Sequence, residues 1–208
     1  MTDARTSWDP FALLLIDVQK DFWTDEMTAA FPDYHDNVAG LLAHCRSEGI
    51  DVLHLRARFR QDRSDWMVRY LGKGSIPCIE GTPGESIFPS ATEAAGEPVI
   101  YKNTFDGFLT GDLHTRLQAR GKRYLLMAGL VTSVCVLLTA AAAAQRGYLV
   151  TLVEDCCADL PSAHAHTLER YPFVFNRTTS DRLESDRDGW LAELARISHE
   201  CAALSPSL

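Results

Sequence analysis

Short runs of apolar residues recur along the chain, and segments with the spacing of amphipathic helices lie between them. The runs predict strands at residues 12–16, 51–55, 98–102, 124–128, 148–153 and 173–176. Helices are expected near residues 37–50, 112–121, 132–146, 162–170 and 188–203. Strands that are apolar throughout and alternate with helices are typical of a parallel sheet covered on both faces. The pattern therefore predicts an α/β fold in three layers, with a mostly parallel sheet and helices on both of its faces.

The bulk composition limits the partners and the compartment that we expect. A length of 208 residues favours a single domain over residues 1–208, and the net charge of −8 argues against nucleic acid as the main partner. No apolar run approaches the roughly 20 residues that span a bilayer, so no membrane partner is expected. The N-terminal residues lack the pattern of a secretory signal, and the six cysteines show no metal-binding spacing. We expect a cytoplasmic protein with reduced thiols.

Chemically reactive side chains follow three of the predicted strands. Asp17 follows the first strand, Lys102 closes the third, and Cys135 lies where the fourth passes into a helix. Because the carboxyl ends of parallel strands meet at one edge of a sheet, we expect these three side chains to converge. Each residue alone could be structural, as a turn cap, a solvated strand end or core packing. Together they favour a site, because a buried Asp and Lys are costly unless they pair.

The chemistry of these three groups is suited to nucleophilic catalysis by the thiol. A helix start and the nearby Lys102 are expected to lower the pKa of the Cys135 thiol, which then acts as a nucleophile. Asp17 could accept the thiol proton and later pass it to a leaving amine. Backbone N–H groups of Val131 and Cys135, where strand turns to helix, are expected to form an oxyanion hole.

The stretches that carry these residues resemble a known family. LLLIDVQKDF, VIYKNTFDGF and GLVTSVCV, in this order and at these separations, resemble the isochorismatase-like cysteine hydrolases over residues 11–183. The stretches IEGTPGESIFP and AAQRGYLVTLVEDCCAD are similar to further motifs of the family. The resemblance implies a Rossmann-like sheet of about six strands and a catalytic triad at Asp17, Lys102 and Cys135. It also implies a cis peptide at Leu130–Val131 that turns the Val131 N–H toward the oxyanion, and a homo-oligomer, either a dimer or a tetramer.

Three functions remain open within this resemblance. The cysteine at position 135 favours the amidohydrolase branch, similar to N-carbamoylsarcosine amidohydrolase, ureidoacrylate hydrolase and nicotinamidase. Such an enzyme would cleave a C–N bond of a small carboxamide or ureide through a thioester, without an organic cofactor. One alternative is an isochorismatase-type vinyl-ether hydrolase, in which Asp17 is the acid and Cys135 a bystander. The other is a catalytically inactive binding module of the same fold.

A metal site of the nicotinamidase type is not expected. Such a site would follow the second predicted strand, where this chain reads HLRARFRQDRSDW. His54 stands there without a second histidine, and three arginines would repel a dication. We therefore read His54 as a packed or hydrogen-bonded strand residue. His164 and His166 lie two apart on a predicted helix, so they do not share a helix face and are read as structural or solvated.

Candidate substrate-binding residues lie near the triad motifs. We expect Phe22, Phe105 and Trp66 to wall the pocket, and Gln19 to orient Asp17 or cap its loop. Residues 56–73 carry a local charge of +4, with six basic residues against Asp62 and Asp65. This segment is expected to pair with the acidic body or with a second subunit. The alternative is that one arginine, Arg58 in our choice, binds a substrate carboxylate in bidentate fashion. The expected partner is thus a small amide or ureide that could carry a carboxylate.

Overall fold

A computed structural model describes residues 8–109 and 111–204, and its centre is a six-stranded sheet. The strand order is β3-β2-β1-β4-β5-β6, and all five neighbouring pairs are parallel. The strands are β1 (Phe11–Ile16), β2 (Asp51–Ala57), β3 (Val99–Lys102), β4 (Tyr124–Leu130), β5 (Leu149–Ala158) and β6 (Asn176–Thr178). This is the strand order of a Rossmann fold, so the predicted α/β class with parallel strands is confirmed.

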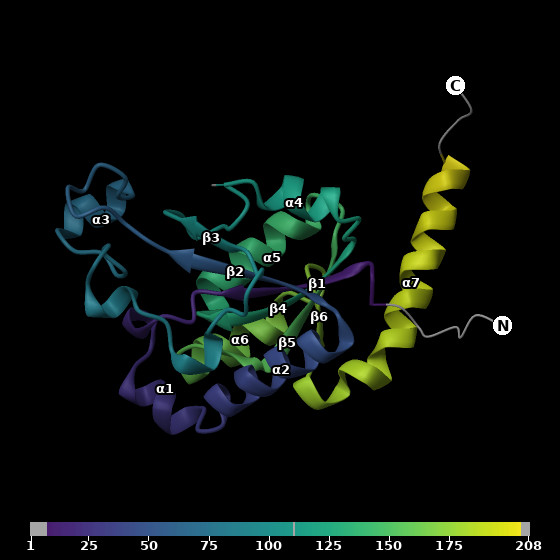
Figure 1. Cartoon of the computed structure of the whole chain (residues 1–208), viewed down its shortest axis with the longest axis horizontal. Coiled ribbons are helices and arrows are strands. Elements are labelled where there is room, and N and C mark those ends of the chain that lie inside the picture. Colours follow the sequence, from purple (N-terminus) through teal and green to yellow (C-terminus); the bar gives the residue numbers. More distant parts are fainter. Residues whose placement is uncertain (1–7, 110, 205–208) are drawn as a thin grey trace.

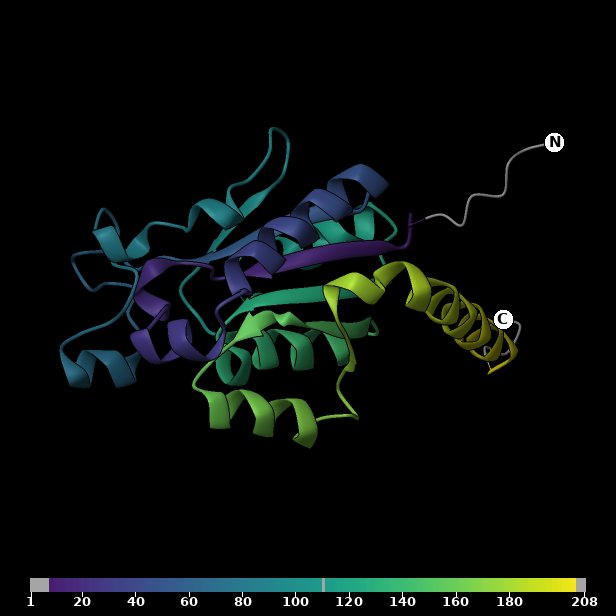
Figure 2. The ribbon, with the colours of Figure 1, turned by 90° about the horizontal axis from the view of Figure 1, so that it is seen from below.

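Helices cover both faces of the sheet and complete the three layers (Figure 2). They are α1 (Asp25–Ala30), α2 (Tyr34–Glu48), α3 (Val68–Lys73), α4 (Leu113–Ala119), α5 (Leu137–Ala144), α6 (Pro161–Arg170) and α7 (Leu183–Leu204). Buried side chains of α2 and α7 pack on one face, and those of α4, α5 and α6 pack on the other. Within β1, Leu13 and Leu15 face the first layer, whereas Ala12 and Leu14 face the second. Every residue of β1 is buried, which explains its uninterrupted apolar sequence.

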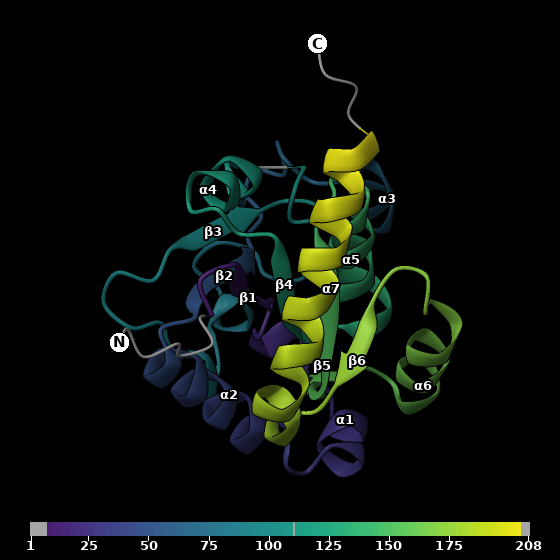
Figure 3. The ribbon, with the colours of Figure 1, turned by 90° about the vertical axis from the view of Figure 1, so that its right-hand side faces the viewer.

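The two ends of the sheet carry different elements (Figure 1). The arrow of β2 points toward α3, which lies beyond the carboxyl ends of the strands. Helix α7 lies at the opposite end and crosses in front of the sheet in Figure 3. There Trp190 packs against Tyr124 and Phe11, at ring-centroid distances of 5.4 and 6.1 Å. The reactive side chains were expected at the carboxyl ends of the strands, which is the end of the sheet near α3.

Some predicted elements differ from the observed ones. The sixth strand was predicted too early, because residues 172–174 form a turn in which Phe173 is 76% exposed. The expected helix at 132–146 begins with a π-helical turn, Thr132–Val136, before α5. Helices α1 and α3 were not predicted, because each has only six residues and little periodic signal. Across the residues that the structure describes, no helix is long and apolar enough to cross a membrane.

Gly129, near the end of β4, gives a direct test of the register between β1 and β4. Its φ is +125°, and an added Cβ would lie 1.9 Å from the Ile16 carbonyl oxygen. Gly147 also has a positive φ, of +85°, but has open space around it. We expect Gly147→Ala to cost about 1–2 kcal/mol for the left-handed backbone alone. Gly129→Ala should cost about 1–3 kcal/mol more, because backbone atoms must move apart.

Urea unfolding of the two variants measures this difference in the free energy of unfolding. Equal losses for Gly129→Ala and Gly147→Ala would show that β1 and β4 do not approach closely at this position.

Candidate active site

The three predicted catalytic side chains lie together at the carboxyl ends of their strands. Asp17 follows β1, Lys102 ends β3, and Cys135 lies in the π-helical turn after β4. The Nζ of Lys102 donates hydrogen bonds to Asp17 Oδ2 at 2.6 Å and to the Thr104 carbonyl at 3.0 Å. Both Asp17 and Lys102 act on the Cys135 thiol through charge and hydrogen bonding. An acid, an amine and a thiol from three strands therefore share one site.

The backbone at Asp17 aims this carboxylate into the site. Its φ is +50°, a left-handed conformation that Asp tolerates better than most residues. The Asp17 N–H donates to the Leu55 carbonyl at 2.9 Å, which ties the turn to the end of β2. Asp17 Oδ1 is buried, and in the described part of the chain it has no hydrogen-bond partner of ordinary geometry. This oxygen is available to accept a proton.

The turn that holds Cys135 is fixed by contacts from β5 and α6. The expected cis peptide at Leu130–Val131 is confirmed. The Ser133 N–H donates to Asp159 Oδ2 at 2.8 Å, and Asp159 follows directly after β5. Within residues 8–109 and 111–204, no acceptor bonds the Val131 N–H. Because Val131 and Cys135 both line the cavity described below, an unpaired donor lies close to the thiol.

Burial decides the protonation of the thiol. It raises the pKa of Cys135 well above its ordinary value, and the charge of Asp17 raises it further, whereas Lys102 lowers it. Burial lowers the pKa of Lys102, but the attraction of Asp17 and Cys135 outweighs this and the net direction is upward. The expectation of a lowered thiol pKa was wrong, because burial of the thiol and the charge of Asp17 together outweigh the charge of Lys102. The resting site thus holds a neutral thiol beside an ion pair.

A cavity of about 350 Å³ opens beside the thiol. Its lining residues come from the turn after β1, the ends of β2 and β4, and the loops around α3 and after β3. They are Asp21, Phe22, Ala57, Phe59, Met67, Tyr70, Pro77, Lys102, Thr104, Phe105, Val131, Val134 and Cys135. Phe22 and Phe105 line it as predicted. The walls are mainly apolar, which suits a small organic molecule.

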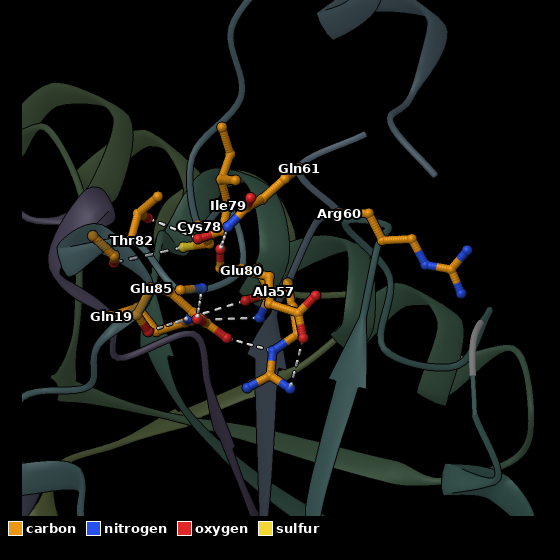
Figure 4. Close-up of polar contacts among 12 residues, drawn as sticks. Gln19, Ala57, Arg60, Gln61, Cys78, Ile79, Glu80, Thr82 and Glu85 are labelled. Carbon is orange, nitrogen blue, oxygen red and sulfur yellow. Dashed lines mark hydrogen bonds and ion pairs between the residues drawn. The ribbon is translucent and has the colours of Figure 1, made fainter. Parts of the chain in front are cut away.

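Gln19 lies outside this cavity and organises loops instead (Figure 4). Its side-chain amide donates to the carbonyls of Ala57 and Glu85, at 2.9 and 2.8 Å, and its oxygen accepts the Ala57 N–H at 2.8 Å. Gln19 is fully buried. It therefore joins the turn after β1 to the end of β2 and to the Pro83–Glu85 turn, rather than contacting a substrate.

Trp66 and Arg58 also lie outside the cavity. The Trp66 indole is buried in a small cluster with Phe59 and donates to the Arg60 carbonyl at 2.7 Å. Arg58 pairs with Glu85 and stacks on the ring of Tyr101 at 3.5 Å. Trp66 holds the segment before α3, and Arg58 stabilises a loop contact.

Two of the histidines singled out in the sequence, His54 and His164, have structural partners. His54 is buried on β2, and its Nε2 lies 2.8 Å from Glu97 Oε2. The Nδ1 of His164 lies 2.8 Å from the Thr132 hydroxyl, and His166 is exposed. Among the described residues, no three His, Cys, Asp or Glu side chains cluster as metal ligands. His54 is thus the hydrogen-bonded strand residue that the sequence suggested.

Several lining residues were missed by the sequence analysis. Met67 and Pro77 flank α3, in a stretch without periodic pattern, and Asp21 lies within the first motif, four positions after Asp17. Asp159, which bonds the Ser133 N–H, was detectable, since it ends the stretch AAQRGYLVTLVEDCCAD that resembles the family. For the others, only the folded loops show which side chains face the cavity.

Comparison with known proteins agrees with this fold. Residues 11–181 match the isochorismatase domain. The chain is 30% identical over 168 residues to an uncharacterized isochorismatase family protein of Bacillus subtilis, covering 74% of this chain and 86% of that one. It is 28% identical over 153 residues to a maleamate amidohydrolase of Pseudomonas putida, covering 71% and 72%. A solved isochorismatase family protein from Desulfovibrio vulgaris superposes with a TM-score of 0.76 at 29% identity, covering 85% of this chain and 97% of that one. The chain belongs to the isochorismatase family, a family of hydrolases.

The protonation of the thiol can be tested by alkylation of Cys135 with iodoacetamide. Asp17 raises the pKa of this thiol and Lys102 lowers it, so Asp17→Asn should speed alkylation at pH 7 and Lys102→Met should slow it. Each unit of pKa change alters the thiolate fraction about tenfold. Mass spectrometry of the peptide that contains Cys135 gives the rates.

The wild-type protein supplies a second measurement that needs no variant. Its alkylation rate at Cys135 should keep rising at pH values above the midpoint of an ordinary thiol, about 8.5. A midpoint below that value would mean that Lys102 governs the thiol and burial does not.

Proposed function

We propose that this protein is a cysteine amidohydrolase that cleaves the C–N bond of a small carboxamide or ureide through a thioester. The observation that carries the proposal is the Lys102–Asp17 ion pair beside the Cys135 thiol, at the wall of a cavity of about 350 Å³. A thiol with an adjacent carboxylate is suited to covalent acyl transfer. The likeness to a maleamate amidohydrolase supports this branch of the family.

The first half of the reaction forms the thioester. As the sulfur of Cys135 attacks the amide carbonyl carbon, its proton passes to Asp17 Oδ1, the oxygen without another partner. Lys102 offsets the negative charge on the sulfur during attack. The carbonyl oxygen becomes an oxyanion, which the N–H groups of Val131 and Cys135 stabilise. When the intermediate collapses, Asp17 returns the proton to the departing nitrogen, and ammonia or an amine leaves.

The second half regenerates the thiol. Water enters the space that the amine has left, and Asp17 takes one of its protons while its oxygen attacks the thioester carbonyl. Collapse of this second intermediate breaks the C–S bond, and Asp17 passes its proton to the sulfur. The products are a carboxylic acid, or a carbamic acid from a ureide, together with the neutral thiol. No organic cofactor takes part in these steps.

An ammonia-release screen over primary amides and ureides, carried out with Cys135→Ala, tests the proposal. We expect this variant to lose about 10³-fold or more in kcat/KM, because the nucleophile is absent. Cys201→Ala, an exposed position on α7, is the matched control and should keep full activity. Quenching wild-type turnover with hydroxylamine should yield the hydroxamate of the acyl group.

Two outcomes would contradict the proposal. One is vinyl-ether hydrolysis that survives Cys135→Ala but is lost in Asp17→Asn, which makes Asp17 the acid and the thiol a bystander. The other is a lack of turnover with every amide, ureide and vinyl ether in the screen. That result would indicate an inactive binding module.

A further inference from the structure

The cavity beside Cys135 contains a carboxylate that the proposed reaction does not use, that of Asp21. Asp21 belongs to the short 3₁₀ turn Lys20–Phe22, and its Oδ2 accepts the Cys78 N–H at 2.7 Å. Gly84 lies directly against it, since an added Cβ there would come within 1.9 Å of Asp21 Oδ1. The loop thus leaves room for this carboxylate and holds it at the cavity wall.

The charge of Asp21 is not neutralised by the surrounding protein. Among the ion pairs of the described residues, none joins Asp21 to a lysine, arginine or histidine. The hydrogen bond that it accepts comes from the Cys78 backbone amide, which carries no positive charge. A molecule in the cavity therefore meets an uncompensated negative charge.

Lys102 is the cation that lines the cavity, and its hydrogen-bonding capacity is already used. A lysine ammonium has three N–H donors. Two of them bond Asp17 Oδ2 and the Thr104 carbonyl, and the third interaction is with the Cys135 sulfur. Lys102 cannot also donate to a substrate carboxylate unless it breaks one of these three contacts.

The basic residues nearby are engaged outside the cavity. Arg58 pairs with Glu85, and Arg56 pairs with Glu93. In Figure 4 the Arg60 side chain points away from the loop contacts. It lines a neighbouring hollow on the other side of Lys102, together with the carboxylates of Asp65 and Glu80.

The Nζ of Lys73, on α3, lies 5.5 Å from the centre of the Tyr70 ring, and Lys73 does not line the cavity. Among the described residues that line the cavity, no cation is then left to offset the charge of Asp21 for an anionic substrate.

We propose that the cavity selects amides whose non-reacting part is apolar and either neutral or positively charged, and that Asp21 is the residue that disfavours a carboxylate there. The apolar walls formed by Phe59, Met67 and Phe105 favour a hydrocarbon or aromatic body. Asp21 is itself exposed to solvent, so screening limits its effect to a few-fold. This selection rests on the proposed amidohydrolase function, because it concerns the substrates of that site.

A set of three amides of similar length tests the selection by turnover. They are 4-aminobutanamide, which is cationic, pentanamide, which is neutral, and succinamate, which is anionic. In the wild type, kcat/KM should be higher for the first two than for succinamate. Asp21→Asn should lower the ratio of the cationic to the anionic substrate by about threefold to tenfold. The control Asp25→Asn removes an exposed carboxylate of α1 that does not line the cavity, and should leave the ratio unchanged.

A second measurement does not depend on turnover. Methanethiosulfonates with cationic, neutral and anionic tails form a disulfide with a thiol and release a sulfinate, so their rates at Cys135 report the charge of the cavity. Each rate is divided by the rate of the same reagent with 2-mercaptoethanol. The ratio of cationic to anionic reagent should exceed one in the wild type and fall in Asp21→Asn. Because ratios are compared, a change in the thiol pKa cancels.

The outcomes separate the two proposals. Equal rates for all reagents, or faster reaction of the anionic one, overturn the selection even if amides are hydrolysed. A clear preference for the cationic reagent without hydrolysis of any amide supports the selection by charge and contradicts the amidohydrolase function. A preference for succinamate that persists in Asp21→Asn would show that another group binds the carboxylate, and would also overturn the selection.

Discussion

The buried ion pair between Lys102 and Asp17 is the interaction on which the rest of the site depends. The side chains are 1% and 0% exposed, so both charges are removed from water. A buried pair of this kind is stable only when the geometry is close and the remaining donors have acceptors, because lost hydration costs several kcal/mol per ion. The 2.6 Å contact and the Thr104 carbonyl meet these conditions. The pair therefore fixes the end of β3 relative to the end of β1, with β2 between them.

Burial is the main reason why the thiol is neutral at rest, and the carboxylate of this pair adds to it. Lys102 lowers the pKa of the thiol, but burial and the charge of Asp17 outweigh this effect. A thiol whose pKa is raised reacts slowly with general reagents. In the proposed reaction the thiolate forms only as the carbonyl is attacked, with Asp17 as the base. Asp17 and Cys135 can then lie together in one buried site without two negative charges facing each other.

Most of the fold could be predicted because buried parallel strands leave a clear local pattern. Continuous apolar runs placed the first five strands to within a few residues of their observed starts. The failure at β6 has a physical reason: an edge strand of three residues, two of them exposed, has no apolar run, whereas the preceding turn does. The short helices α1 and α3 likewise depend on packing against the loops near them rather than on a periodic pattern.

The sequence by itself determined that Asp17, Lys102 and Cys135 would meet, because each follows a strand and parallel pairing brings strand ends to one edge. Only the tertiary structure decided which loop side chains face the cavity. Trp66 and Arg58 both follow β2 in the chain, yet the first is held by the Arg60 carbonyl and the second by Glu85, 27 positions away. Loop side chains take their direction from such contacts in the folded chain, which leave no periodic pattern in the amino-acid sequence.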